Sequence, residues 1–236
     1  RKVEGLDTYV EFAHGPEADT VLVEENGARF EVPLAGGQKT GWFYDHRMNR
    51  QRLQAYAPGK KVLDVFSYVG GWGIQAACAG ASQVTCVDAS SAAVDAVHHN
   101  AKLNGLENVD TIEGDAFDAL KALADEKEKF DIVVLDPPAL IPRRRDQKAG
   151  EQAYARLNQL GLRLLERDGL LVSASCSMHL SQEKLIDIIR SSGRKIDRFV
   201  QLLEQGHQAP DHPIVPGIPE TDYIKSCFVR SLTGFL

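Results

Sequence analysis

KVLDVFSYVGGWGIQA, residues 61–76, is the stretch that decides the fold of this chain. It opens with a short apolar run, Val62 to Phe66, which has the length of a buried strand. Glycines follow at positions 70, 71 and 73, and a helix of small residues is expected after them. Glycine allows positive φ angles and the close approach of a ligand, and the start of a helix presents free N–H groups. This stretch therefore predicts the crevice of a doubly wound, nucleotide-binding α/β sheet.

The chain downstream of this stretch alternates between strand-like and helix-like patterns. Alternating strands and helices imply right-handed crossovers and a parallel sheet that is covered on both faces. Strands are expected at 83–87, 109–112, 130–135 and 170–175, and two further strand-like stretches at 195–203 and 223–232. Helices are expected at 73–79, 90–103, 151–166 and 181–192, with a short one that ends near 123.

The N-terminal part lacks this alternation. TVLVEENGARFEV, residues 20–32, contains two β-prone runs around Asn26-Gly27, which is a strong hairpin signal. We therefore predict a small N-terminal α+β segment with a hairpin at residues 1–45. The main domain is predicted at residues 46–236, and a helix at 46–57 begins it. Because the first residue is arginine, we interpret the chain as part of a longer protein.

The composition is ordinary for a globular protein, with 43% hydrophobic and 25% charged residues among 236. No apolar run has the length of a membrane span and no signal peptide is visible, so we expect no membrane partner. The four cysteines are scattered, which favours a reducing, cytoplasmic compartment and does not support a metal site. We expect Cys78, Cys86 and Cys227 to be buried and structural. The net charge of −6 argues against a generally basic nucleic-acid surface.

Polar residues follow the expected strands at the edge where ligands of open α/β sheets bind. Asp88 lies about 20 residues after the glycines, where a carboxylate can accept both ribose hydroxyls of a nucleotide; it could instead cap the next helix. Asp115 and Asp136 end two further strands. Residues 71–76 also satisfy the dinucleotide pattern G-x-G-x-x-A, so a dehydrogenase remains an alternative at this point.

Two of the strand ends carry residue types that suit chemistry on a planar base. The prolines of Asp136-Pro137-Pro138 stiffen the turn, so that its carboxylate is held rigidly at the edge; the motif could also be a plain strand-ending loop. Cys176 follows the next strand, between two serines, and its thiolate could act as a covalent nucleophile. The cluster Arg143-Arg144-Arg145 is either a solvated charge run or a contact for an RNA phosphate backbone.

Four stretches together resemble class I S-adenosylmethionine-dependent methyltransferases. They are GQKTGWFYDHR (37–47), DVFSYVGGWG (64–73), DPPALIPRRRD (136–146) and SCSMH (175–179). More closely, the chain is similar to the family of bacterial large-subunit ribosomal RNA 5-methylcytosine methyltransferases. The resemblance implies a Rossmann-like α/β fold, with a seven-stranded, mostly parallel sheet that has an antiparallel edge strand. It also implies an N-terminal RNA-binding PUA domain that this chain lacks, and 23S ribosomal RNA as the partner, with a homodimer as an option.

The same resemblance implies a covalent mechanism and a set of cofactor contacts. Cys176 would attack carbon 6 of cytosine, and Asp136 would hydrogen-bond the ring nitrogen while carbon 5 takes the methyl group. The cofactor would be S-adenosylmethionine (SAM). The expected cofactor-binding residues are Lys39, Thr40, Phe43, Arg47, Asp64, Phe66, Ser67, Tyr68, Gly70, Gly71, Asp88, Ala89, Ser90, Asp115, Ala116, Phe117, Asp136 and Pro137.

Three alternatives stay open at this stage. A methyltransferase for another RNA position, such as guanine N7, needs no nucleophilic cysteine, so Cys176 decides against it if that residue is catalytic. A nicotinamide-dependent oxidoreductase explains the glycines but leaves Asp136-Pro137-Pro138 and Cys176 without a role. A non-catalytic RNA-binding module is disfavoured by the acidic charge and by the complete set of strand-end residues.

Overall fold

A computed structural model describes residues 14–15, 18–34 and 41–233 of the chain. Within these residues, seven strands form one sheet and two strands form a separate hairpin. The hairpin consists of β1 (Thr20–Glu25) and β2 (Ala28–Pro33). The strands of the large sheet are β3 (Lys61–Val65), β4 (Gln83–Asp88), β5 (Val109–Glu113), β6 (Phe130–Leu135), β7 (Leu165–Ser175), β8 (Arg198–Gly206) and β9 (Lys225–Thr233). The helical elements are η2 (Tyr44–His46), α1 (Arg47–Gln54), α2 (Gly71–Cys78), α3 (Ser91–Leu103), α4 (Ala116–Asp125), η3 (Arg144–Asp146), α5 (Gln147–Leu164), α6 (Gln182–Arg194) and η4 (Pro219–Thr221).

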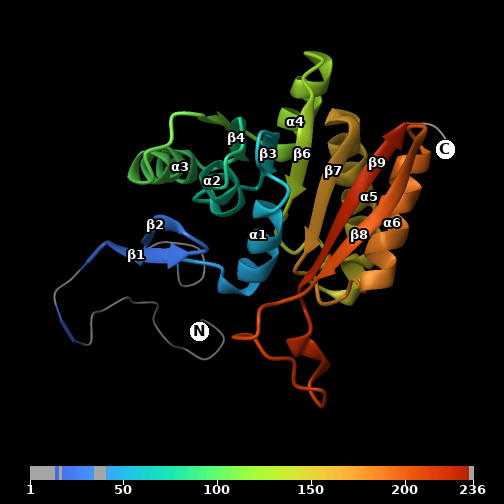
Figure 1. Cartoon of the computed structure of the whole chain (residues 1–236). Helices are drawn as coiled ribbons and strands as arrows, with labels where there is room; N and C mark the ends of the chain where they lie inside the picture. The colour runs from blue at the N-terminus through green and yellow to red at the C-terminus, as the bar shows by residue number, and fades with distance from the viewer. Residues whose placement is uncertain (1–13, 16–17, 35–40, 234–236) are drawn as a thin grey trace.

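The large sheet has the strand order β5-β4-β3-β6-β7-β9-β8 (Figure 1). Neighbouring strands from β5 to β7 pair in parallel, and β9 pairs antiparallel with both β7 and β8. This confirms the predicted seven-stranded, mostly parallel sheet with antiparallel pairing at one edge. From β3 the chain continues to β4 and β5 on one side of that strand, and it then crosses back to form β6 on the other side. Ligands of such sheets bind at this switch point, beyond the carboxyl ends of the strands.

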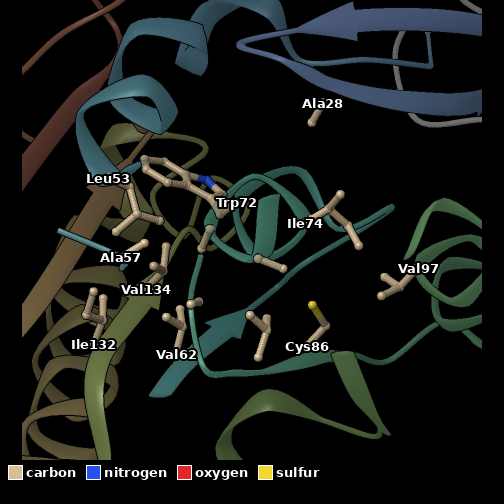
Figure 2. Packing of buried hydrophobic residues seen from close by; sticks show 14 of the residues in the cluster. Ala28, Leu53, Ala57, Val62, Trp72, Ile74, Cys86, Val97, Ile132 and Val134 are labelled. Carbon is tan, nitrogen blue, oxygen red and sulfur yellow. The ribbon is translucent and has the colours of Figure 1, made fainter. Parts of the chain in front are cut away.

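Helices cover both faces of the sheet because the central strands are apolar on both sides. Val62 of β3 belongs to the cluster that packs under α2 and α3, whereas Leu63 belongs to the cluster under α4, α5 and α6. The same alternation separates Ile132 from Val133 in β6. Figure 2 shows the first cluster, in which Trp72 and Ile74 of α2 lie above Val62 and Val134. The two cores hold the strand ends of the sheet in fixed positions.

The predicted hairpin is confirmed, with its turn at Asn26 (φ 51°) and Gly27 (φ 84°). Positive φ at both positions is the geometry of the tight hairpin turn for which Asn-Gly is preferred. Phe30 and Val32 of β2 are fully buried and belong to the same cluster as α2 and α3. The amide N–H of Glu31 also donates to the side-chain oxygen of Asn100 on α3 (2.8 Å). The hairpin therefore packs against the helices on one face of the main sheet.

Several expectations from the sequence need correction, among them the strand expected at 195–203, since residues 195–197 form a turn and β8 begins at Arg198. Strand β7 begins at Leu165 rather than Leu170, because Asp168 adopts a left-handed φ of 61° and the register with β6 shifts there without ending the strand. Helix α5 begins at Gln147, four residues earlier than expected, directly after the turn η3. Cys78 is exposed rather than buried, since it lies at the C-terminal end of α2, while Cys86 and Cys227 are buried as predicted. None of the described helices is long and apolar enough to cross a membrane.

Candidate active site

The turn between β3 and α2 holds three residues in the left-handed region of φ. They are Phe66 (65°), Tyr68 (49°) and Gly70 (87°). This conformation is unfavourable for bulky side chains and persists only where the surroundings enforce it. Here the amide N–H of Tyr68 donates to the Asp88 carboxylate (2.9 Å), and that of Ser67 donates to the carbonyl of Val87 (3.0 Å). The end of β4 thus fixes the turn, as expected of a ligand-binding loop.

Glycine at position 73 is required by the close packing of α2 on the sheet. A Cβ atom there would lie 2.6 Å from the Cys86 sulfur and 3.0 Å from a Val84 methyl group. The backbone N–H of Gly73 donates to Oδ2 of Asp64 (2.8 Å). The first turn of α2 is thereby drawn onto the central strand, directly below the candidate site.

Asp64 is a buried carboxyl group beneath this turn. Its Oδ1 atom has no hydrogen-bond partner among the described residues. Burial raises the pKa of Asp64 to about 7, although the Gly73 N–H bond opposes this, and the charges of Asp136 and Asp88 raise it further. Three carboxyl groups therefore repel one another around the same space, and a bound cation would relieve that repulsion.

A cavity of about 590 Å³ opens at the carboxyl ends of the strands. Its floor comes from the turn after β3 and its walls from the ends of β4, β5, β6 and β7 and from the segment around η2. The predicted site residues that line it are Phe43, Phe66, Ser67, Tyr68, Gly71, Asp88, Ala89, Asp115, Ala116, Asp136, Pro137 and Cys176. The sheet brings these residues together from positions that are far apart in the sequence.

Other predicted residues lie elsewhere in the structure. Asp64 and Gly70 lie beneath the turn, and Ser90 caps α3 by accepting from the amide of Ala93 (3.3 Å). Arg47 faces away from the cavity toward Asp211 (3.5 Å). Phe117 is also absent from the lining. Arg143, Arg144 and Arg145 are exposed around η3 and do not line the cavity, while Lys39 and Thr40 lie outside the described residues.

The carboxylates at the ends of β4 and β5 are partly engaged by the backbone. Asp88 accepts from the amides of Tyr68 (2.9 Å) and Ser90 (3.0 Å), and Asp115 caps α4 by accepting from the amides of Phe117 and Asp118. Since an ionised carboxylate can accept about four hydrogen bonds, each group keeps capacity for a ligand. Both carboxylates are held in place and line the same side of the cavity.

Asp136 and Cys176 line the other side, at the ends of the neighbouring strands β6 and β7. Oδ2 of Asp136 accepts from the indole N–H of Trp72 (2.9 Å), and Oδ1 lies 3.4 Å from Nε2 of His46. The Cys176 sulfur lies 4.0 Å from the carbonyl oxygen of Pro137. A half-buried thiol and a fixed carboxylate thus share one wall of the cavity.

Buried hydrogen bonds hold the loop that carries Cys176. The phenol of Tyr154 on α5 bonds to the hydroxyl groups of Ser175 (2.8 Å) and Ser177 (3.0 Å). The ammonium of Lys225, at the start of β9, donates to the carbonyl of Ser177 (2.8 Å). Burial lowers the pKa of Lys225, while the charges of Asp222 and Cys176 oppose that shift. Two elements therefore fix the backbone on either side of the cysteine.

Sequence reasoning missed several residues of the lining. Trp42, Asp45, His46 and Arg50 come from the stretch around η2, and Trp72 is the second residue of α2. The motif GQKTGWFYDHR indicates this stretch, but within its described part the sequence predicts only Phe43 and Arg47 as site residues. Burial of the intervening acid and imidazole is the missing information, because charged side chains are normally read as exposed.

Fold and site together define a class of protein. A doubly wound sheet with an inserted antiparallel strand, a strained turn after the first strand, and carboxylates at the next strand ends form the site of a class I SAM-dependent methyltransferase. The residues fit SAM, since its ammonium and sulfonium charges match a cavity lined by Asp88, Asp115 and Asp136, with the buried Asp64 beneath its floor. Residues 4–219 match the model of the SAM-dependent methyltransferase family, and the chain belongs to this family.

Known proteins and solved structures agree with this family. The chain is 38% identical over 234 residues to ribosomal RNA large subunit methyltransferase I of Aeromonas salmonicida (strain A449), over 98% of this chain and 59% of that protein. It is 36% identical over 237 residues to the protein of the same name from Klebsiella pneumoniae (strain 342), over 98% of this chain and 58% of that protein. The chain thus spans about three fifths of the length of these relatives.

Among solved structures, a proposed SAM-dependent methyltransferase from Streptococcus mutans and a proposed methyltransferase in complex with SAH each superpose with a TM-score of 0.81. Each is 26% identical to this chain, over 92% of this chain and 57% of theirs. A tRNA m1G37 methyltransferase from M. jannaschii shares the fold with a TM-score of 0.67 at 18% identity, over 95% of this chain and 60% of that one.

Proposed function

We propose that the chain is the catalytic part of a SAM-dependent methyltransferase that forms 5-methylcytosine in large-subunit (23S) ribosomal RNA. The observation that carries the proposal is the placement of Cys176 and Asp136 on neighbouring strand ends, in the wall of the cavity that has Asp88 at its other side. Relatives named ribosomal RNA large subunit methyltransferase I support ribosomal RNA as the substrate. The thiol supports carbon 5 of a pyrimidine as the position, because a nitrogen position such as guanine N7 has its own nucleophilic lone pair and needs no such group.

Cys176 acts as the nucleophile in this proposal. Carbon 5 of cytosine is a weak nucleophile, and addition of the thiolate to carbon 6 forms a C–S bond and moves the electrons of the double bond toward carbon 5. SAM, when bound, supplies a methyl group on a sulfonium sulfur, and SAH leaves once that methyl has moved to carbon 5. Removal of the carbon 5 proton by a base then restores the double bond, and the Cys176 sulfur departs as thiolate.

Asp136 acts on the edge of the base while the adduct forms. One oxygen of its carboxyl group accepts from the exocyclic amine, and a proton shared between the other oxygen and ring nitrogen 3 neutralises the charge that develops as the thiolate adds. The stiff Asp136-Pro137-Pro138 turn and the Trp72 indole keep that carboxyl group in place. The base must be unpaired or flipped to enter, since neither carbon is accessible within a stacked helix. The exposed Arg143, Arg144 and Arg145 would contact the phosphates beside it.

Methylation of unmodified ribosomal RNA with labelled SAM tests this proposal. Full-length protein is compared with its Cys176→Ala and Cys176→Ser variants, and with Cys78→Ser as a control at an exposed cysteine of α2. The RNA is digested and the labelled nucleoside is identified by mass. We expect label in 5-methylcytidine from the native protein and the control, and none from either Cys176 variant.

A second measurement detects the covalent step directly. RNA with 5-fluorocytidine at the target lacks the proton that must leave carbon 5, so the adduct with Cys176 should persist and shift the mass of the protein. Label in a methylated guanine, with full activity in both Cys176 variants, would instead support the alternative of a non-covalent methyltransferase. Binding of SAM without methylation of any RNA would refute ribosomal RNA as the acceptor.

A further inference from the structure

His46 is a buried histidine that the proposed chemistry does not use. It ends the short turn η2, its side chain is 4% exposed, and its ring lies 5.5 Å from that of Trp72. Its Nε2 atom lies 3.4 Å from Oδ1 of Asp136, whose other oxygen accepts from Trp72. Trp72 thus hydrogen-bonds one oxygen of the carboxylate, while His46 lies at ion-pair distance from the other and its Nε2 atom makes no hydrogen bond with the described residues. Contacts to both oxygens restrain the rotation of this carboxylate, which lines the cavity.

The amide of Asn49 decides which nitrogen of His46 carries the proton. The Nδ2 group of Asn49 lies 3.2 Å from Nδ1 of His46 and donates to the carbonyl of His207 (3.1 Å). The Oδ1 atom accepts from the Arg52 guanidinium (3.1 Å), so the amide cannot be turned around without losing both partners. Gly206 packs so closely that a Cβ there would lie 2.0 Å from that oxygen. The Nδ1 atom of His46 therefore accepts a hydrogen bond, and Nε2 carries the hydrogen.

We propose that His46 is the positioning residue for Asp136, with its tautomer set by Asn49. The Nε2–H group then faces Oδ1 of Asp136 at 3.4 Å, so that a small shift of either side chain lets even a neutral imidazole donate to it. The catalytic carboxylate stays oriented over a wide range of pH, because the donation does not depend on a second proton on the ring. This inference rests on the proposed function, in which Asp136 contacts the acceptor base.

Many charged groups surround His46, and they too can change the methylation rate as the pH changes. They lie on its own segment, on α1, on the hairpin, at the strand ends and in the C-terminal segment. They are Asp45, Arg47, Arg50, Arg52, Glu25, Asp64, Asp88, Asp136, Cys176, Glu204, His207, Asp211 and Tyr223. A charge at position 49 would also act on Arg52 and its partner Glu204, so the variants at His46 itself give the independent measurement.

The substitution Asn49→Asp is the sharpest test. A carboxylate at position 49 accepts the hydrogen of Nδ1, so a neutral imidazole would then present its Nε2 lone pair to Asp136. Only the doubly protonated ring could donate to both carboxylates. We expect the ratio of variant to native methylation rate to fall by about 10- to 100-fold between about pH 6 and pH 9, the range typical for loss of an orienting residue. Asn108→Asp, at the opposite edge of the sheet, is the matched control and should show no such fall.

A second pair of variants keeps the inference testable if Asn49→Asp does not fold. His46→Gln retains an N–H donor, whereas His46→Leu has none. We expect the leucine variant to lose about 10- to 100-fold in kcat and the glutamine variant to recover most of that loss. Equal loss in both variants, or a ratio for Asn49→Asp that is the same at every pH, would overturn the role of His46.

The outcome for His46 is separable from that of the proposed function. The identity of the nucleoside made by the native protein tests the chemistry, and the rate ratios test the positioning of Asp136 whichever base is methylated. Native protein that makes 5-methylcytidine while His46→Leu keeps full activity refutes only the positioning role. A methylated guanine together with a pH-dependent loss in Asn49→Asp refutes only cytosine as the acceptor.

Discussion

Replacement of Asp64 by asparagine should change how the stability of the protein depends on pH. The Asp64 carboxyl group is fully buried, accepts one hydrogen bond from the Gly73 amide, and has a pKa raised to about 7. In an unfolded chain the pKa of an aspartate is about 3.9. Asparagine keeps an oxygen for the Gly73 N–H group but cannot ionise. The variant therefore isolates the free energy that is linked to this one proton.

The sign and size follow from the two pKa values. Between about pH 4 and pH 7 the unfolded chain has released this proton while the folded protein keeps it, so the free energy of unfolding falls as the pH rises. Each pH unit corresponds to about 1.4 kcal/mol, which gives about 4 kcal/mol over the whole window. Between pH 5 and pH 8 the native protein should lose about 3 kcal/mol relative to Asp64→Asn, with no further loss above pH 8.

Urea denaturation at several pH values measures this difference. The native protein and Asp64→Asn are compared at about pH 5 and pH 8, with Asp95→Asn, at an exposed position of α3, as the control for loss of a carboxylate. We expect Asp64→Asn to gain about 3 kcal/mol on the native protein across this interval and the control to gain nothing comparable. A constant difference between Asp64→Asn and the native protein at every pH would show that Asp64 is not protonated in the folded state.

Two further predictions concern packing and a buried ion pair. Gly73→Ala should lower the stability by about 1–3 kcal/mol, since its Cβ would lie 2.6 Å from the Cys86 sulfur. In a double-mutant cycle of thermal unfolding, Cys86→Ala in the same chain should recover part of that loss. Additive losses in stability would contradict the clash. Glu25→Gln should lower the free energy of unfolding, measured by chemical denaturation, by about 3–5 kcal/mol, because it leaves the buried Arg50 guanidinium without its charged partner. A loss below about 1 kcal/mol would show that water or another group compensates for that charge.

Much of the fold follows from local patterns in the sequence. The apolar run of β6 is bounded as expected at Phe130 and Leu135, because a strand buried on both faces tolerates few polar residues. The turn at Asn26-Gly27 follows from backbone preference alone. Parallel strands present their carboxyl ends together, which predicts Asp88 and Asp136 at one edge, and both line the cavity.

The contacts that complete the site could not be predicted in this way. Trp72 reaches Asp136 across 64 positions of sequence, and Tyr223 donates to Asp45 across 178. Such pairs are set by tertiary packing, and the local hydrophobic periodicity of the sequence carries no information about it. Burial of His46 has the same origin, since a polar residue in a short turn carries no periodic signal of being buried. The contacts assigned to individual SAM atoms stay predictions.

The position of β9 has a consequence for how the protein is made. Strand β8 is synthesised before β9, but its sheet neighbour is β9, which inserts between it and β7. On a ribosome, the strands up to β7 can pair as they emerge, whereas β8 must wait for residues up to Thr233. Lys225, the first residue of β9, also holds the carbonyl next to Cys176. The nascent chain can therefore assemble its cofactor side early, while its cysteine loop gains its final support only when translation has passed β9.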